Sequence, residues 1–241
     1  MIKAAAPRVT VAMSMHNAAP FLRECIDSVL AQSFADFEFL IVDDGSTDSS
    51  ATIAASYTDP RLCIISRPHG FIESLNTLLS HAQGEYIARM DADDIMLPHR
   101  LHAQVSYLDT HPGVDAVSSC ATRIDATGRP TGHIGNHSDS PVTITPRMMC
   151  EANHVCNPST MFRRSAIESR SLSYDPAFEW AEDYAFWASL IGRGGVVHCL
   201  PDTLLLYRHS QGQVTSLHYD EMRSVLFTVP HGIICCVEPV V

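Results

Sequence analysis

The stretch Phe39-Leu-Ile-Val-Asp-Asp-Gly-Ser-Thr-Asp48 decides which fold class fits this chain of 241 residues. It is an apolar run, typical of a strand buried on both faces, that ends in the carboxylates of Asp43 and Asp44 and a glycine turn. Asp, Gly, Ser and Thr also favour strand exits and helix caps, so a purely structural role for the stretch stays open. A strand of this kind predicts an α/β protein with a mostly parallel central sheet.

Further apolar runs on both sides of this stretch alternate with segments of helical periodicity. The alternation predicts the order β-α-β-α-β-α-β, with a sheet flanked by helices and with ligands beyond the carboxyl ends of the strands. The expected strands are Val9–Ser14, Phe37–Val42, Leu62–Ser66 and Glu85–Met90, and the expected helices begin near Pro20, Ser46 or Thr47, and Gly70.

The rhythm becomes less regular after Asp115. A Gly/Pro/Ser-rich stretch, residues 128–141, predicts a hairpin and a loop. We also expect strands at Val114–Ser119, Val196–Leu200 and Leu204–Tyr207 and a helix over Ala181–Gly192. These patterns predict a single domain over residues 1–222, with a Rossmann-like nucleotide-binding half (1–115) and a second-substrate half (116–222), followed by an apolar tail (223–241).

Charge and composition exclude several classes of protein. Lys+Arg number 16 and Asp+Glu 27, so the formal net charge of −11 would repel nucleic acid, and no basic patch interrupts it. Hydrophobic residues at 46% and charged residues at 18% exclude a disordered or coiled-coil chain. The eight cysteines lack the spacing of a zinc site, which predicts free thiols in the reducing cytoplasm.

The two ends of the chain predict no membrane span. The alanine run before Pro7 is too short for a signal peptide, and Pro230 and Pro239 interrupt the apolar segment Val225–Val241. We expect that segment to pack on the domain or to be poorly ordered. A peripheral contact at the inner face of a membrane is the alternative.

A second acidic segment repeats the pattern of the first. In Glu85-Tyr-Ile-Ala-Arg-Met-Asp-Ala-Asp-Asp94, a strand delivers Asp91, Asp93 and Asp94 at its carboxyl end. Such close carboxylates repel one another unless a divalent cation, an arginine or full hydration relieves them. In an extended chain Asp91 and Asp93 face the same way and can address one ligand, while Asp94 points elsewhere. Because the chain has no glycine-rich phosphate loop, a hard cation would have to carry the charge of a diphosphate.

Three acidic motifs, in their order and spacing, resemble those of a known family. They are IVDDGSTD (41–48), HAQGEYIARMDADDIMLPHRL (81–101) and FEWAEDYAFW (178–187). From about residue 7 to 216 the chain resembles the inverting glycosyltransferases of family 2, which have the GT-A fold. The resemblance implies a Mg²⁺- or Mn²⁺-dependent enzyme that moves a sugar from a nucleotide-diphosphate donor, with a UDP-sugar favoured, to an acceptor hydroxyl. It also implies a saccharide or lipid-linked acceptor and a role in cell-surface polysaccharide synthesis.

The resemblance implies a nucleotide-sugar site at the ends of the first two strands. Asp43 and Asp44 would hold the nucleobase and ribose, with Asp44 on the base. His16, within Ser14-Met-His-Asn17, takes the place of an aromatic residue that packs on the base, and a solvated loop histidine is the alternative. Ser14 and Asn17 belong to the same implied site.

The second motif would hold the diphosphate side of the donor. By the resemblance, Asp93 is the metal ligand of a DxD motif, and Asp91 lies near the ribose or the donor sugar. Arg89 and Arg100 are expected near the donor pocket. As arginines beside a carboxylate cluster they could equally form structural ion pairs.

The third motif, Glu182-Asp183, opens the late helix. Acidic residues there complement the helix dipole, which is the structural interpretation. A single-displacement transfer needs a base for the acceptor proton, and a carboxylate on a rigid helix end suits that role. The resemblance places the base at Asp183, with Glu182 beside the acceptor.

Two departures from the family pattern concern the second half. Asn157-Pro158-Ser159 stands where relatives usually have His-Pro-Ser, and Tyr207-Arg208-His209-Ser210 where they tend to have Tyr-Arg-x-His. A catalytically weak nucleotide-sugar-binding module is therefore the alternative function. An aspartyl-phosphate phosphatase is excluded, because it needs a later lysine and Lys3 is the only one.

Overall fold

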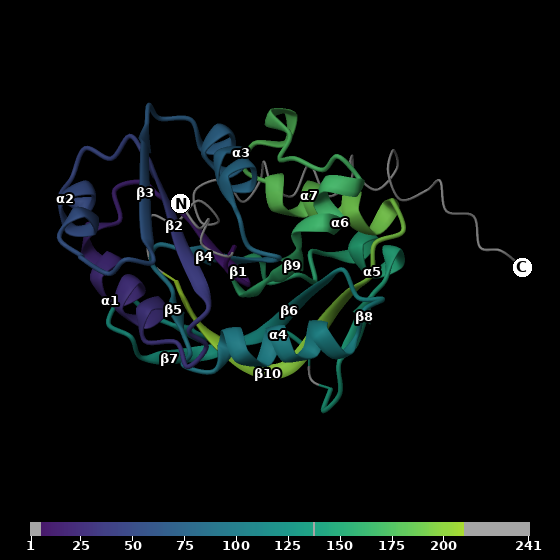
Figure 1. Cartoon of the computed structure of the whole chain (residues 1–241). Coiled ribbons are helices and arrows are strands. Elements are labelled where there is room, and N and C mark those ends of the chain that lie inside the picture. Colours follow the sequence, from purple (N-terminus) through teal and green to yellow (C-terminus); the bar gives the residue numbers. More distant parts are fainter. Residues whose placement is uncertain (1–5, 137, 210–241) are drawn as a thin grey trace, which may run out of the picture.

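The computed structural model describes residues 6–136 and 138–209, and its centre is a mixed β-sheet with helices on both faces (Figure 1). Along the sheet the strands follow the order β3-β2-β1-β4-β9-β6-β10-β5, with β7 paired to β6 and β8 to β10. The strands are β1 (Val9–Met15), β2 (Phe37–Asp44), β3 (Leu62–Arg67), β4 (Tyr86–Asp91), β5 (Ile95–Met96), β6 (Ala116–Ile124), β7 (Pro130–Ile134), β8 (Val142–Ile144), β9 (Met161–Arg163) and β10 (Val197–Arg208).

Helices connect most of these strands. The α-helices are α1 (Ala19–Leu30), α2 (Ser50–Ala55), α3 (Phe71–His81), α4 (Arg100–Thr110), α5 (Pro146–Glu151), α6 (Arg164–Ser169) and α7 (Glu182–Gly192), with 3₁₀ turns η1 (Asn157–Ser159) and η2 (Pro176–Phe178).

The first half confirms the predicted parallel arrangement. β1 pairs in parallel with β2 and β4, and β2 with β3. All four strands lie within two residues of the predicted bounds. β2 extends to Asp44, so both acidic residues of the first motif belong to the strand itself.

The second helix begins later than predicted, at Ser50 rather than at Ser46 or Thr47. Side-chain acceptors hold the preceding turn in another shape. Ser46 N donates to Asp43 Oδ1 (3.1 Å) and Thr47 N donates to Asn17 Oδ1 (2.8 Å). These bonds fix residues 45–49 as a loop at the end of β2.

The second half adds antiparallel pairs to the sheet. β9 runs antiparallel to both β4 and β6, and β7 forms the predicted hairpin with β6. The predicted strands Val196–Leu200 and Leu204–Tyr207 are one continuous strand, β10, whose register against β6 shifts between Leu200 and Leu205. The sequence pattern does not distinguish such an irregularity within one strand from a break between two strands.

The core has two parts, one on each face of the sheet. Alternation along β1 sends Val11 and Met13 toward α1 and α4, and Ala12 toward the opposite face. There α3 and α7 pack, with Leu75 and Trp187 fully buried. The sheet is therefore held rigidly from both sides, which fixes the positions of its strand ends.

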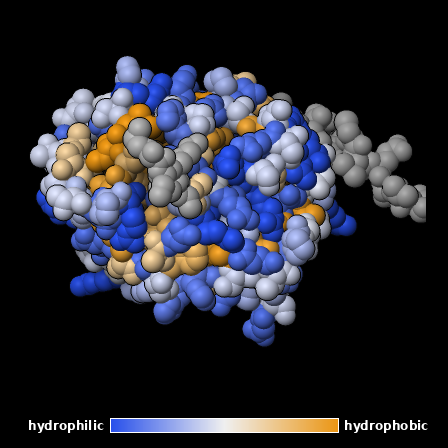
Figure 2. All heavy atoms as spheres, viewed as in Figure 1, coloured by the Kyte–Doolittle hydropathy of each residue, from blue (hydrophilic) through white to orange (hydrophobic). Residues whose placement is uncertain are grey.

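Figure 2 shows polar side chains over most of the visible face and an apolar area toward the side of β3. β3 is the edge strand, and Ile64 is 36% exposed on it. None of the helices in residues 6–136 and 138–209 is long and apolar enough to cross a membrane. The predicted tail, 223–241, and the predicted domain end at 222 lie outside the described residues.

Candidate active site

The carboxyl ends of β1, β2 and β4 meet at one edge of the sheet. Pairing places Met15 beside Asp43, and Ser14 beside Asp91. The register therefore brings together the first and second acidic motifs, whose residues Asp43 and Asp91 lie 48 positions apart in the sequence. The strand ends form the floor of the candidate site.

Asp44 is held in a single orientation. It is 1% exposed, and its Oδ1 accepts hydrogen bonds from Gly70 N (2.8 Å) and Ser74 Oγ (2.6 Å), with Arg67 Nη1 3.5 Å away. Its Oδ2 is buried and accepts no hydrogen bond, although His69 Nδ1 lies 3.0 Å from it. A buried carboxylate oxygen in this state favours a ligand that donates a hydrogen bond.

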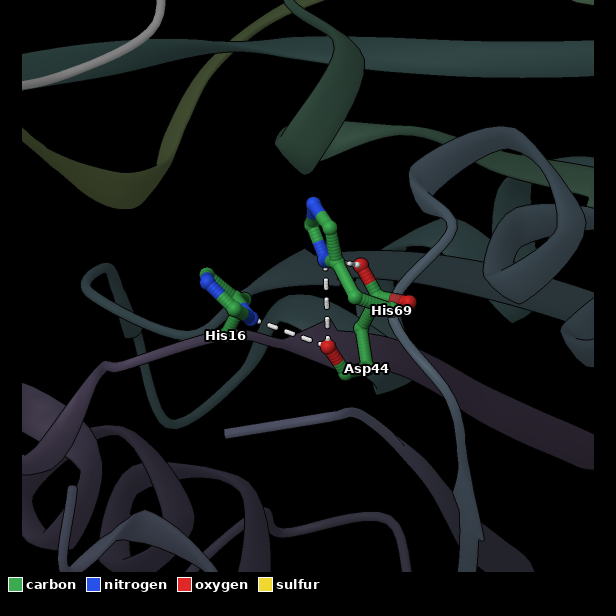
Figure 3. Close-up of side chains that lie close together, drawn as sticks. All are labelled: His16, Asp44 and His69. Atoms are coloured by element: carbon green, nitrogen blue, oxygen red, sulfur yellow. Dashed lines mark hydrogen bonds and ion pairs between the residues drawn. The ribbon is translucent and has the colours of Figure 1, made fainter. Parts of the chain in front are cut away.

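Two histidines lie over Asp44 (Figure 3). His16 Nδ1 is 2.9 Å and His69 Nδ1 is 3.2 Å from Asp44 O, and the ring centroids are 4.4 Å apart. Sequence reasoning selected His16 and missed His69. His69 precedes Gly70 in the loop after β3, and its place beyond a third parallel strand end is the signal that could have found it.

One donor atom each from His16, Asp44 and His69 lies within 4.8 Å of the others, a spacing compatible with a cation. The hydrogen bonds of His16, however, indicate that this cluster does not hold a cation. Asn17 Oδ1 accepts from Thr47 N (2.8 Å), so the Asn17 NH₂ faces His16 Nε2 at 3.1 Å. His16 Nε2 then accepts, and Nδ1 carries the proton donated to Asp44 O. A protonated Nδ1 has no lone pair for a metal, so we assign this cluster to hydrogen bonding.

The remaining residues of the first motif shape the loop. Asn17 has a left-handed φ of 51° and ties the β1 end to the turn after β2. Gly45 has φ +70°, and a Cβ there would lie 2.8 Å from His69 N, so the close approach requires glycine. Asp43 caps the turn through Ser46 N, whereas Ser14 is half-buried within β1.

Arg89 and Asp91 form an ion pair at the end of β4. Arg89 is 3% exposed, and its Nη2 donates to Asp91 Oδ1 at 2.9 Å while Nη1 donates to Ala12 O at 3.2 Å. Its Nε is buried without a hydrogen-bond partner. The Asp91 side chain is 37% exposed and can reach a ligand.

Arg100 lies beneath the site rather than on its surface. It is fully buried, and its Nη2 donates to Arg89 O (2.8 Å) and Thr160 O (3.0 Å). Burial lowers the pKa of Arg100 to about 10. The sequence predicted either a place near the donor pocket or a structural role for Arg100. Its contacts in the structure are structural.

The segment after Asp91 turns instead of staying extended, since Asp94 N donates to Asp91 O at 3.3 Å. The extended geometry assumed for Asp91 and Asp93 is therefore wrong. Asp94 does point away from them, into the protein, where it is 1% exposed and its Oδ1 accepts from Arg208 N (2.8 Å). Burial raises the pKa of Asp94 well above its usual value, and the charges of Asp93 and Asp91 raise it further.

Arg208 braces this turn from β10. Its Nε donates to Asp93 O (2.7 Å) and its Nη2 to Glu24 Oε2 (2.7 Å). Arg208 stands within Tyr207-Arg208-His209-Ser210, which departs from the family pattern, and the sequence predicts no role for it. Its contacts with residues 115 and 184 positions earlier in the chain could not be read from local spacing.

Glu182 and Asp183 begin α7. Asp183 Oδ1 accepts from Tyr184 N (2.6 Å) and Oδ2 from Asn153 Nδ2 (3.2 Å). Burial raises the pKa of Asp183 to about 6. Burial and then the charge of Asp183 raise the pKa of Glu182 to about 8. The charges of Asp91 and Arg89 also act on both pKa values, so the start of α7 and the end of β4 face one electrostatic environment.

Asn157, at the first departure from the family pattern, is bound to the core. Its Oδ1 accepts from Trp187 Nε1 at 3.2 Å, and its carbonyl accepts from Thr160 N at 3.0 Å. Near the second departure, His209 N donates to Ile124 O at 2.8 Å. Asn157 thus has a structural role in this chain.

The site therefore combines acidic strand ends with an acidic helix start on one mixed sheet, and sequence comparison identifies the family of the chain. The sequence profile of glycosyl transferase family 2 matches residues 10–170. The chain is 31% identical over 227 residues to an uncharacterized glycosyltransferase of Haemophilus influenzae, covering 89% of this chain and 69% of that protein. The chain belongs to glycosyl transferase family 2.

Other relatives and solved structures agree with this assignment. The amylovoran biosynthesis glycosyltransferase AmsE of Erwinia amylovora is 29% identical, with 80% of this chain and 72% of AmsE covered. The structure of S. aureus TarS with UDP-GlcNAc has a TM-score of 0.74 at 20% identity, covering 90% of this chain and 65% of that one. Mannosyltransferase PcManGT from Pyrobaculum calidifontis, with GDP-Man and Mn²⁺, has a TM-score of 0.71 at 20% identity, covering 98% and 66%. The fold is therefore GT-A, and this chain spans about two thirds of these two structures.

Proposed function

We propose that this chain transfers a sugar from a UDP-sugar donor to an acceptor hydroxyl, with inversion at the anomeric carbon, in the synthesis of a cell-surface polysaccharide. The observation that carries the proposal is Asp44 Oδ2, a buried carboxylate oxygen without a hydrogen bond at the nucleotide end of the sheet. The imide N–H of uracil can donate to it. His16 and His69 present two rings beside it, on which a base can pack.

Asp183 is the proposed general base. It removes the proton of the acceptor hydroxyl, and the acceptor oxygen bonds to the anomeric carbon. The bond from that carbon to the diphosphate oxygen breaks, and its electron pair leaves with the nucleoside diphosphate. A pKa raised to about 6 keeps Asp183 ionised at neutral pH and closer to proton-accepting strength than an ordinary aspartate. Glu182 contacts the acceptor in this proposal.

The carboxylates at the end of β4 fit a divalent cation. They offer oxygen ligands, which Mg²⁺ and Mn²⁺ prefer, and the crowding of Asp91, Asp93 and Asp94 is visible in the raised pKa of Asp94. Asp93 would hold the ion, and Asp91 would lie beside the ribose or the donor sugar. When bound, the ion neutralises charge on the departing nucleoside diphosphate.

The relatives support this donor class. Structures of TarS contain UDP or UDP-GlcNAc, the structure of PcManGT contains GDP-Man and Mn²⁺, and AmsE is a glycosyltransferase of amylovoran biosynthesis. A uracil nucleotide suits Asp44, and guanine, which also carries a ring N–H donor, is the competing base. We propose a saccharide or lipid-linked acceptor.

Thermal shift with UDP-sugars and GDP-sugars, each with and without Mn²⁺, tests the proposal. A UDP-sugar at 100 times its Kd should add about 2.7 kcal/mol of stability. Asp44→Asn should lose this gain, while Asp36→Asn, at an exposed position just before β2 and at the opposite end of the strand from Asp44, should keep it. Stabilisation by no nucleotide sugar would contradict the proposal. Stabilisation without transfer to any acceptor would favour the weak binding module.

A further inference from the structure

A cavity of about 210 Å³ lies among β6, β8 and the loop that precedes η1. Its lining is mixed, since Ile144 and Val155 are apolar while Asn136 and Asn153 are amides. Asn153 and His154 are exposed where they line it, so the cavity opens to solvent there. Among the described residues, none that line it is Asp, Glu, Lys or Arg.

One lining residue connects the cavity to the proposed base. Asn153 Nδ2 donates to Asp183 Oδ2 at 3.2 Å, and Asn153 Oδ1 accepts from Val155 N at 3.1 Å. The second bond fixes the amide, so the same side chain borders the cavity and orients the carboxylate. A molecule in the cavity would therefore lie next to Asp183.

The floor of the cavity is tied to the strand that carries Asp91. Cys156 lines the cavity, and its carbonyl accepts from Ser159 N at 2.9 Å. The next residue, Thr160, accepts a hydrogen bond from Arg89 N at 2.9 Å, two residues before the end of β4. The cavity is thus connected to Asp183 through Asn153 and to β4 through η1, and a second substrate must meet the donor near the proposed base.

We infer that this cavity binds one uncharged sugar ring of the acceptor; the inference rests on the proposed function. Its volume of about 210 Å³ is enough to admit one pyranose ring. A sugar ring has hydroxyl edges and apolar C–H faces, which suit amides beside aliphatic side chains. Asp183, which is hydrogen-bonded to the lining residue Asn153, disfavours an anionic ring, and no cationic side chain is among the described residues that line the cavity.

The test is a substitution on β8 that places a larger side chain in the cavity. Val142 lines it and is half-buried, whereas Thr143, the next residue of the same strand, is exposed and does not line it. Binding of neutral methyl hexosides (gluco, galacto, manno and N-acetylgluco) and of methyl glucuronide is measured by saturation-transfer NMR without donor. We expect a neutral hexoside to bind, the glucuronide to bind more weakly, and Val142→Trp to weaken hexoside binding about tenfold or more.

Thr143→Trp should leave the hexoside signal unchanged, which separates cavity filling from a general effect of tryptophan on β8. The inference is overturned if no neutral hexoside binds, or if Val142→Trp binds it as the wild type does. Calorimetry with UDP on the same proteins distinguishes the two proposals. Hexoside binding that depends on Val142, without UDP binding, contradicts the proposed function alone, whereas UDP binding without hexoside binding contradicts the cavity alone.

Discussion

Ser74 Oγ, on α3, donates a 2.6 Å hydrogen bond to Asp44 Oδ1, at the carboxyl end of β2. Both residues are buried, and the bond helps to turn Oδ2 toward the ring of His69. A residue of α3 therefore positions the carboxylate that we propose to contact the nucleobase.

Removing this hydroxyl should weaken nucleotide binding. Ser74→Ala deletes a hydrogen bond to a charged group, worth about 1.5–3 kcal/mol, so we expect UDP affinity measured by calorimetry to fall roughly tenfold or more. Ser80→Ala, on the exposed side of the same helix, is the matched control and should bind UDP as the wild type does. Unchanged affinity in Ser74→Ala would show that Asp44 is oriented without it.

Glu182 should make stability depend on pH. Its pKa is raised from 4.5 to about 8 in the folded state. The stability it contributes is therefore fully present below pH 4.5 and is lost as the pH rises through 8. Glu182→Gln should match the wild type in urea unfolding at pH 5 and exceed it at pH 9. The exposed Glu179→Gln should show no such difference, and an equal gap between Glu182→Gln and wild type at both pH values would contradict the raised pKa.

Asp93 should make nucleotide binding depend on a divalent cation. Calorimetry with UDP should show weak binding in EDTA and clearly tighter binding with Mn²⁺, and Asp93→Ala should remove the difference. The fold should survive, because losing one of several crowded carboxylates relieves repulsion in the free protein. The control is the exposed Asp36→Ala. Equal affinity with and without Mn²⁺ in the wild type would remove the ion from the account.

The bond between Asn157 and Trp187 should contribute to stability. Asn157→Ala leaves the buried indole N–H without its acceptor, which costs about 1–3 kcal/mol in urea unfolding. In Trp187→Phe there is no N–H to satisfy, so the further change to Ala at 157 should cost much less. Additive losses in the double variant would mean that the two side chains are not coupled.

The first half could be predicted from sequence because its strands are mostly apolar and the helices α1 and α3 have continuous apolar stripes. α4 escaped prediction for the opposite reason. Its buried face includes Arg100 and Gln104 beside Leu101, so the apolar period is interrupted by polar groups that bond to the backbone of η1 and β4. Such a pattern is explained only by the partners that other segments supply.

Some residues of the candidate site could likewise be predicted from the local sequence, and others could not. Acidic residues at strand ends can be recognised from the local sequence, and the structure places Asp44, Asp91 and Asp93 where parallel strands end. His69 and Arg208 act through contacts with residues 25 to 184 positions away, and no local spacing encodes those distances. The turn after Asp91 was missed because an Asp-x-Asp stretch is compatible with either an extended or a turned chain.

The most direct measurement uses the UDP-sugar that stabilises the protein in the thermal-shift test. The rate at which UDP is released from it in a single turnover is compared between the wild type and Asp183→Asn. The amide keeps the shape of the side chain but cannot accept a proton, so the rate should fall roughly 10²–10⁴-fold. In the wild type the rate should rise as the pH passes through about 6, where Asp183 ionises, and UDP affinity should be the same in both proteins. A variant that retained most of its turnover would contradict the assignment of Asp183 as the base.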